Sequence, residues 1–231
     1  MPKEGFHSEE LSHCKRIMEE NSVFFGQGNI RLEGLYAHSG GGIGAVIAHP
    51  HPLMGGDMGN FVVETLTETL LAGGISTLRF NFRGVGRSTG SFDDGQGERD
   101  DLLAAVAYMG EQGVQAVLPA GYSFGAWVSA GILNQKDLLP ALLVSPPIRL
   151  FSFDFQTLRG KVGLIVCGDR DPYCPTETIK NVAAELACRL DIISDADHFF
   201  QSRENDLATC VNHFAAQIIQ HRPRLQKPPA L

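Results

Sequence analysis

Apolar positions along the chain alternate between the two-residue period of strands and the three-to-four-residue period of helices. Glycine-rich turns separate the first apolar runs, which predicts three short strands at residues 23–25, 32–36 and 44–48. The first two are expected to form an antiparallel edge. Val62, Leu66 and Leu70 are spaced four residues apart, which predicts a helix over residues 61–72, and the following pair of glycines ends it.

From residue 75 onward the predicted strands and helices alternate. Strands are expected at residues 75–82, 114–120, 141–144, 162–166 and 190–193, and helices at residues 99–109, 126–133, 176–188 and 204–220. This alternation predicts an α/β fold, in which a mostly parallel central sheet has helices on both faces. Pro119 would remove a ladder hydrogen bond from a central strand, so we expect it at the strand's end, beyond the ladder.

The length of 231 residues suits a single domain, which is expected over residues 21–221. Residues 1–20 are interpreted as an N-terminal extension, with a short amphipathic helix over residues 8–20. Residues 222–231 contain three prolines and are expected to be a loose tail.

Composition excludes several classes of partner. The formal net charge is −7 and no long basic run is present, which argues against a nucleic acid or an anionic membrane as partner. The N-terminus has no apolar core and is not expected to be a signal peptide. The five cysteines occur in unrelated contexts and are interpreted as reduced thiols of a cytoplasmic protein. No paired-cysteine or His-Glu-x-x-His motif occurs, so neither a metal nor another cofactor is expected.

The sequence Gly-Tyr-Ser-Phe-Gly at residues 121–125 lies between a predicted strand and a predicted helix. This context is typical of a nucleophile elbow, in which a strained turn exposes the serine and glycines allow the strand and helix to approach. We therefore expect Ser123 to be the nucleophile and the N–H of Phe124 to face the reacting oxygen. Ser88 lies in a second Gly-x-Ser-x-Gly match, but a loop follows it, and we interpret that match as a strand-exit loop.

A serine hydroxyl needs a base to take its proton, and the base needs a carboxylate to orient it. His198 follows the last predicted strand and is the expected base. Three aspartates are candidates for the carboxylate: Asp169 and Asp171 in the loop after the strand at 162–166, and Asp197 beside the histidine. Spacing alone does not choose between Asp169 and Asp171, whereas Asp197 is expected to point away from its neighbour's ring.

The loop at residues 49–56 reads His-Pro-His-Pro-Leu-Met-Gly-Gly and follows the third predicted strand. Such a loop is expected to supply the second donor of an oxyanion hole. Its two prolines have no N–H, so the first available donors are His51 and Leu53. A metal site at the His-x-His pair is the alternative, but no third ligand lies nearby in the sequence.

With these motifs, the chain resembles the α/β-hydrolases, and most closely a small, cap-less bacterial group related to dienelactone hydrolases. The resemblance rests on the loop at 49–56 and on Asn-Phe-Arg-Gly-x-Gly-x-Ser at 81–88, and it extends over residues 32–214. The family's acid lies in a Gly-x-x-Asp-x-x-x-Pro loop, which residues 168–175 match at Asp171. The resemblance thus implies a triad of Ser123, Asp171 and His198.

Dienelactone hydrolases use a cysteine nucleophile, so the serine indicates ester hydrolysis instead. Only residues 146–160 separate two predicted strands where many relatives insert a lid, so no lid domain is expected. Within this segment, Phe151, Phe153 and Phe155 alternate and are expected to line the acyl side of the cleft. Phe151 and Phe153 are expected to contact the substrate together with Tyr122, although a hydrophobic strap on the core is an equal interpretation.

The predicted function is that of a serine hydrolase which cleaves small carboxylic esters or thioesters through an acyl-enzyme. The alternatives are an acyltransferase with the same triad and a non-catalytic binding module. The expected partner is a small-molecule ester, and the sequence makes no prediction of the oligomeric state.

Overall fold

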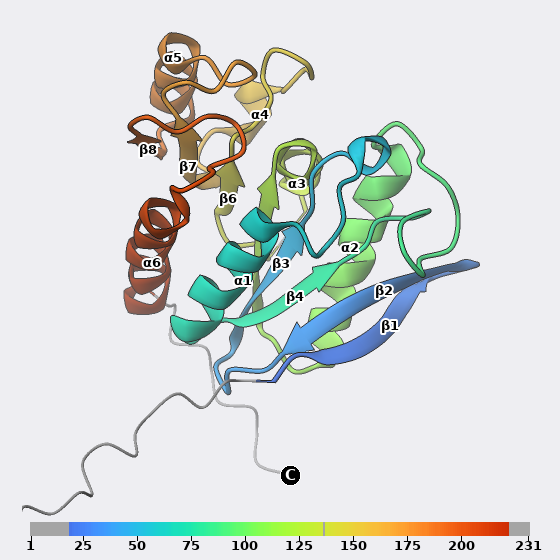
Figure 1. Ribbon diagram of the computed structural model, residues 1–231. Helices are drawn as coiled ribbons and strands as arrows, with labels where there is room; N and C mark the ends of the chain where they lie inside the picture. Colours follow the sequence, from blue (N-terminus) through green and yellow to red (C-terminus); the bar gives the residue numbers. More distant parts are fainter. Residues whose placement is uncertain (1–18, 136, 222–231) are drawn as a thin grey trace, which may run out of the picture.

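The computed structural model describes residues 19–135 and 137–221, which form one eight-stranded sheet (Figure 1). The order of the strands is β1-β2-β4-β3-β5-β6-β7-β8. Their bounds are β1 Asn21–Gln27, β2 Ile30–Ala37, β3 Ile43–Ala48, β4 Ser76–Phe80, β5 Ala116–Tyr122, β6 Ala141–Val144, β7 Val162–Gly168 and β8 Arg189–Ile193. The five neighbouring pairs from β4 to β8 are parallel, which confirms the predicted fold class.

The two N-terminal strands form the predicted antiparallel edge. β1 pairs with β2 from Asn21 opposite Tyr36 to Gln27 opposite Ile30, and β2 continues antiparallel along β4. The strands β3, β5, β6, β7 and β8 pair in parallel, so their carboxyl ends lie together at one edge of the sheet. Parallel α/β sheets bind their ligands at this edge.

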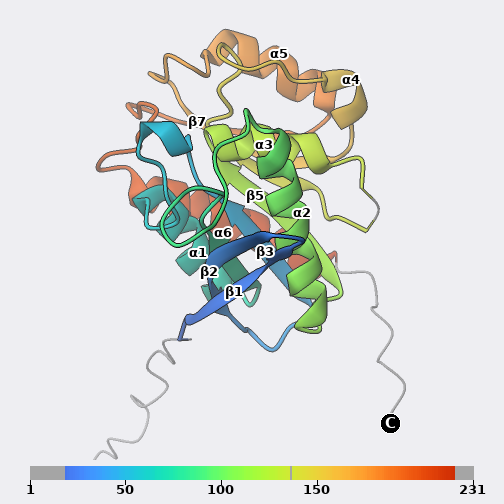
Figure 2. The ribbon, with the colours of Figure 1, turned by 90° about the vertical axis from the view of Figure 1, so that its right-hand side faces the viewer.

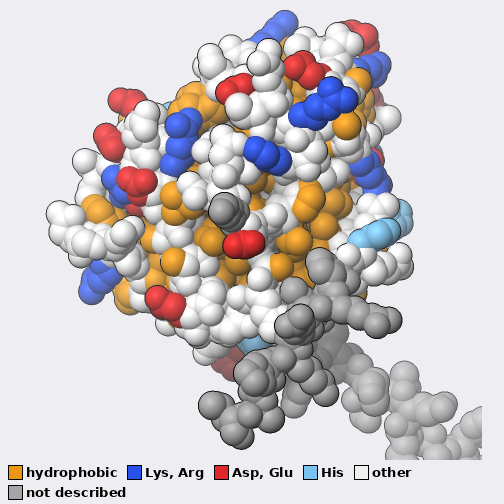
Figure 3. All heavy atoms as spheres, turned by 180° about the vertical axis from the view of Figure 1, so that it is seen from behind, with side chains coloured by type: hydrophobic (Ala, Val, Ile, Leu, Met, Phe, Trp, Pro, Cys, Tyr) orange, Lys and Arg blue, Asp and Glu red, His pale blue; other side chains and the backbone are white. Residues whose placement is uncertain are grey.

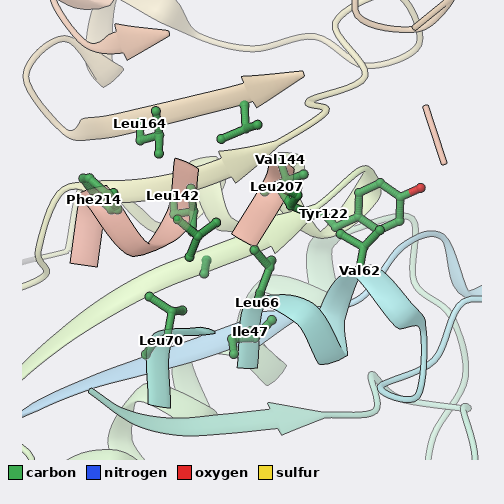
Figure 4. Packing of buried hydrophobic residues seen from close by; sticks show 14 of the residues in the cluster. Ile47, Val62, Leu66, Leu70, Tyr122, Leu142, Val144, Leu164, Leu207 and Phe214 are labelled. Atoms are coloured by element: carbon green, nitrogen blue, oxygen red, sulfur yellow. The ribbon is translucent and has the colours of Figure 1, made fainter. Parts of the chain in front are cut away.

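Helices cover both faces of the sheet (Figure 2). Their bounds are α1 Phe61–Ala72, α2 Gln96–Glu111, α3 Phe124–Ile132, α4 Phe155–Leu158, α5 Thr176–Leu186 and α6 Glu204–Gln220, with a short 3-10 helix η1 at Pro52–Met54. The apolar stripes of α1 and α6 pack on one face, where Leu66 and Phe214 meet the side chains of β3, β5 and β6 (Figure 4). The helices α2, α3 and α5 cover the other face.

The helix α2 begins at Gln96, three residues before the predicted start. Gly95 adopts a φ of 86°, a conformation that favours glycine, and precedes the first helical residue. The carboxylate of Glu98 accepts hydrogen bonds from the N–H groups of Asp93 and Gly95, at 3.0 and 2.7 Å. The Glu98 side chain thus fixes the residues just before the first turn, and Gly97 belongs to the helix and not to the loop.

The expectation that Pro119 lies beyond the ladder was wrong, because this residue lies in the middle of β5, opposite Val46 of β3. The carbonyl of Val117 accepts from Leu139, and the N–H of Ser123 donates to Val144 of β6. The backbone N–H and C=O of every second residue in a strand point to the same neighbouring strand. Residues 117, 119 and 123 therefore face the same side, so the position of the N–H that Pro119 lacks also faces β6. The ladder between β5 and β6 starts only at Ala120, so no bond is lost.

The segment between β6 and β7 contains only α4, a helix of four residues, so the fold has no lid domain.

The predicted helix at residues 8–20 lies outside the described residues, except for Glu19 and Glu20, which are not helical. The Glu20 carboxylate pairs with Arg79 of β4 at 2.6 Å.

Among the helices that the structure describes, none combines the length and the apolar composition that crossing a membrane requires. On the face seen from behind in Figure 3, acidic and basic side chains are interspersed with apolar ones. The four cysteines within the described ranges, Cys167, Cys174, Cys188 and Cys210, are free thiols.

Candidate active site

Ser123 occupies a sharp turn between β5 and α3. Its φ of 55° and ψ of −119° lie in a region that side-chain-bearing residues rarely adopt, which indicates local strain. The flanking glycines make the turn possible, because a Cβ on Gly121 would lie 2.2 Å from the carbonyl oxygen of Gly125. A Cβ on Gly125 would lie equally close to the carbonyl oxygen of Ala48 in β3. The predicted strand, turn and helix around Ser123 are therefore all present.

The loops after β5, β7 and β8 bring Ser123, Asp171 and His198 together. The Nε2 atom of His198 lies 2.9 Å from Oγ of Ser123, and its Nδ1 atom lies 2.8 Å from Oδ2 of Asp171. An ionised carboxylate only accepts hydrogen bonds, so the ring carries its proton on Nδ1 and presents the Nε2 lone pair to the serine hydroxyl.

The carboxylate of Asp171 is buried and held from three directions. Its Oδ1 atom accepts hydrogen bonds from the N–H groups of Tyr173 and Cys174, at 2.8 and 3.1 Å. Burial acts to raise the pKa of Asp171, but the hydrogen bond and charge of His198 and the Tyr173 N–H together hold this pKa below its ordinary value. The group is therefore ionised at neutral pH.

The two other aspartates lie away from the imidazole. Asp169 is exposed, and its backbone carbonyl accepts a hydrogen bond from Thr176. Asp197 is also exposed, and its carboxylate accepts from the N–H of Phe199. Of the three candidates, the structure therefore brings only Asp171 to the histidine.

The loop at residues 49–56 lies beside Ser123, and its backbone donors differ in availability. The N–H of Leu53 donates to Nδ1 of His51 at 3.2 Å, and the side chain of Leu53 is 72% exposed. The N–H groups of Met54 and Gly56 donate to the carbonyl of His51. This corrects the expectation for Leu53, whose N–H is engaged by the neighbouring ring. Within residues 19–135 and 137–221, the N–H of His51 has no acceptor.

The N–H of Phe124 is the first of α3 and has no acceptor within the helix. The positive end of the helix dipole adds to its attraction for a developing negative charge. Phe124 and His51 also meet through their side chains, with ring centroids 4.8 Å apart. Phe124 and His51 both line the cavity that contains Ser123, and neither backbone N–H has an acceptor among the described residues.

The His49 side chain holds the loop at residues 49–56 in place, a role that the sequence did not indicate. Its ring is fully buried, with Nδ1 at 2.6 Å from the carbonyl oxygen of Pro50 and Nε2 at 3.1 Å from the backbone nitrogen of Phe82. Because the Phe82 N–H donates to Nε2, the ring proton lies on Nδ1 and donates to Pro50. Burial lowers the pKa of His49 to about 4. The neutral ring thus connects the loops that follow β3 and β4.

Ser145, which follows β6, was also missed. Its hydroxyl is fully buried and has no hydrogen-bond partner of good geometry among the described residues. It lies close enough to the Asp171 carboxylate to lower the pKa of that group. The one available signal is position, because Ser145 directly follows a strand at the same sheet edge as Ser123.

A cavity of about 380 Å³ opens directly over Ser123. The residues that line it are Pro50, His51, Met54, Gly55, Gly56, Asn60, Tyr122, Ser123, Phe124, Leu150, Phe151, Tyr173, His198 and Phe199. None of these carries an acidic, lysine or arginine side chain, so the cavity suits an uncharged ligand. Met54, Leu150 and Phe199 are more than half exposed and give the mouth of this cavity an apolar rim.

The three residues predicted to contact the substrate have different positions. Phe151 lines the cavity and meets the rings of His51 and Phe124. Tyr122 also borders it, but its ring is buried and its hydroxyl donates to the carbonyl of His198 at 2.9 Å. Phe153 does not line the cavity, which corrects that expectation. It stacks on Phe155, because the chain turns into α4 and the two-residue alternation of a strand is lost.

Ser88, in the second Gly-x-Ser-x-Gly match, uses its hydroxyl to hold backbone groups together. Its hydroxyl donates to the carbonyl of Asn81 at 2.7 Å and accepts from the N–H of Glu33 at 3.0 Å. The loop after β4 is thereby attached to β2. Within the described ranges, no group of three or more His, Cys, Asp or Glu side chains is placed to hold a metal ion.

Comparison with known proteins identifies the family to which the chain belongs. No model of a described protein family matches the chain. An uncharacterized protein of Rickettsia prowazekii is 33% identical over 211 residues, which are 85% of this chain and 89% of the relative. A solved structure of an alpha-beta serine hydrolase homologue from Coxiella burnetii is 32% identical, with a TM-score of 0.78, and the match covers 86% of this chain and 99% of that one.

A serine hydrolase without a lid from Xanthomonas campestris is also similar in structure. It is 27% identical, with a TM-score of 0.78 over 89% of this chain and 97% of that chain. The similarity to these relatives agrees with the order of the strands, the turn at Ser123 and the absence of a lid. The chain therefore belongs to the α/β-hydrolase superfamily, among its small lidless serine hydrolase homologues.

Proposed function

We propose that the protein is a serine hydrolase that cleaves small, uncharged carboxylic esters or thioesters through an acyl-enzyme on Ser123. The observation that carries this proposal is the chain of two hydrogen bonds from Ser123 Oγ through the His198 ring to Asp171, at 2.9 and 2.8 Å. A binding module needs neither a base nor an oriented carboxylate, so this arrangement favours catalysis.

In the first half-reaction, Ser123 Oγ attacks the ester carbonyl carbon while His198 Nε2 takes the hydroxyl proton. The carbonyl oxygen becomes an oxyanion, which the N–H groups of Phe124 and His51 stabilise. His198 then donates the proton to the leaving alcohol or thiol as the bond to the acyl carbon breaks. Asp171 keeps the ring in its tautomer and stabilises the imidazolium.

In the second half-reaction, water takes the place of the alcohol. His198 removes a proton from the water, the hydroxide attacks the acyl carbon, and the proton returns to Ser123 as the carboxylic acid leaves. The exposed mouth of the cavity supports water as the acceptor, because no lid excludes it.

Labelling with a fluorophosphonate, followed by intact mass spectrometry, tests the proposal without knowledge of the substrate. We expect one adduct per chain, lost in Ser123→Ala and retained in Ser88→Ala. The Ser88 variant is the matched control because it removes the other serine of the same motif. Lack of labelling in the wild-type protein, or labelling that survives Ser123→Ala, would refute the proposed nucleophile.

The acyltransferase alternative uses the same first half-reaction and differs in the acceptor. Hydrolysis of a p-nitrophenyl ester in the presence of increasing glycerol or ethanol, with product analysis, separates the two. We expect free acid as the main product. Dominant transfer to a dilute alcohol would favour the transferase.

A further inference from the structure

A second cavity, of about 210 Å³, lies between α2, α3 and the segment that contains α4. The residues that line it are Arg99, Trp127, Ala130, Gly131, Asn134, Ser152, Phe153, Asp154, Thr157 and Leu158. It shares no lining residue with the cavity over Ser123. The proposed hydrolysis gives it no role.

Arg99 supplies the positive charge of this cavity. Its guanidinium lies over the ring of Trp127, with Cζ 4.9 Å from the ring centroid. Its Nε atom is buried and has no hydrogen-bond partner among the described residues, and no carboxylate oxygen of those residues lies within 4.0 Å of the group. A partly buried guanidinium whose charge is not balanced by a carboxylate would be stabilised by an anion.

Gly131 of α3 provides the space for this guanidinium. A Cβ at Gly131 would lie 2.4 Å from Nε of Arg99 and 3.0 Å from its Cζ, so any larger residue would displace the group. The planar guanidinium presents its donors as a fork that matches the two oxygens of a carboxylate.

The other lining groups favour a small monoanion with an apolar part. Asn134 accepts a hydrogen bond from Lys161 through Oδ1, which leaves its amide N–H groups as donors. Phe153 and Leu158 offer apolar surface. Asp154 accepts from the N–H of Thr157 as the cap of α4, and its negative charge disfavours a doubly charged phosphate.

The two cavities are separated by a pair of stacked rings. Trp127 stacks on Phe151, with centroids 4.6 Å apart and planes at 27°, and Phe151 lines the cavity over Ser123. Trp127 is the only tryptophan of the chain. Its fluorescence therefore reports on a charge that approaches Arg99.

We propose that the cavity at Arg99 binds a small monocarboxylate, with the guanidinium holding the carboxylate and Phe153 and Leu158 contacting its apolar part. Sodium butyrate is the probe, titrated against Trp127 fluorescence at constant ionic strength set with sodium chloride. We expect a saturable change in the wild-type protein and in Ser123→Ala. Binding at the catalytic serine would instead be altered by that substitution.

Two variants with matched controls complete the test. Arg99→Gln and Gly131→Ala should each weaken butyrate binding at least tenfold, the second by displacing the guanidinium without changing its charge. Arg31→Gln removes a distant exposed arginine, and Gly110→Ala adds a helical Cβ with nothing within 4 Å, so both should bind as the wild type does. Circular dichroism checks that each variant folds.

Three results would overturn the proposal. One is a wild-type titration without saturation. Another is butyrate binding that survives both Arg99→Gln and Gly131→Ala. The third is tighter binding of inorganic phosphate than of butyrate, which would assign the cavity to a different class of anion.

Discussion

The hydroxyl of Tyr122 donates a 2.9 Å hydrogen bond to the backbone carbonyl of His198. This bond connects the residue before Ser123 to the loop that holds the imidazole. Burial and the nearby charges of Asp171 and Asp197 raise the pKa of Tyr122, so the hydroxyl keeps its proton and remains a donor. The bond fixes the distance between the two loops on which the proposed proton transfer depends.

We expect Tyr122→Phe to lower both stability and turnover. The buried carbonyl of His198 would lose its donor, which costs about 1–3 kcal/mol of unfolding free energy. Turnover should fall several-fold because the imidazole is less well positioned, while fluorophosphonate labelling of Ser123 persists at a slower rate. Urea unfolding and kcat measure the two effects. Unchanged values for both would show that the bond does not position the histidine.

Asp171→Asn and Asp169→Asn form a matched pair within one loop. The Asp171 substitution replaces the acceptor of the His198 Nδ1–H with an amide, so the ring can adopt the wrong tautomer, and we expect kcat to fall by about 10³–10⁴. Asp169 is exposed and distant from the ring, so its substitution should change kcat less than twofold. Steady-state hydrolysis of p-nitrophenyl acetate compares them. A larger loss at Asp169 would contradict the assignment of the acid.

His49 should make the protein less stable in acid. Its pKa is lowered from an ordinary value of 6.5 to about 4 in the folded state. As the pH falls through 6.5, the unfolded chain takes up a proton that the folded chain resists, so stability is lost between pH 6.5 and about 4. The difference amounts to about 3 kcal/mol.

Urea unfolding at several pH values measures this loss. His49→Gln should be less stable than the wild type at neutral pH, because the bonds to Pro50 and Phe82 are disturbed. Its stability should depend less on pH in the same window. Parallel pH profiles for the two proteins would show that His49 is not the group responsible.

The dimensions of the cavity predict a preference for short acyl chains. A buried CH₂ contributes about 0.8 kcal/mol of binding free energy. A cavity of about 380 Å³ without a lid buries only the first few carbons of an acyl chain, so longer chains gain no further binding free energy. We expect acetyl to butyryl p-nitrophenyl esters to have the highest kcat/KM of a homologous series. A kcat/KM that keeps rising to dodecanoyl esters would mean that the apolar rim at Leu150 and Phe199 extends the acyl site.

The architecture and the sharp turn at Ser123 could be predicted because local sequence patterns determine them. The helix at Phe61–Ala72 has clear apolar spacing and a glycine stop, and its predicted bounds match the structure. The turn at Ser123 needs glycines at fixed offsets, which a sequence shows directly. The choice of Asp171 over Asp169 rested on resemblance, because the direction of a loop side chain depends on contacts made far away in the sequence.

The missed features depend on tertiary contacts. Leu53 appeared to be a free donor, but a side chain two residues away accepts its N–H. Phe153 does not line the cavity, because the chain enters the short helix α4 directly after it. The alternating phenylalanines suggest an extended segment and give no sign of this helix. His49 and Ser145 act on Phe82 and Asp171 in the loops after β4 and β7, and nothing in their local sequence indicates those partners.

The position of β8 has a consequence for how the protein loses activity. β8 is an edge strand of the sheet and pairs only with β7, whereas β5, which Ser123 directly follows, lies between β3 and β6. Edge strands open at a lower free-energy cost than central ones, so β8 and the loop of His198 should detach by local unfolding while the rest of the sheet persists. Amide hydrogens of β8 should then exchange with solvent faster than those of β5. Inactivation by urea should precede the change in Trp127 fluorescence, leaving a folded chain with an intact serine and no base beside it.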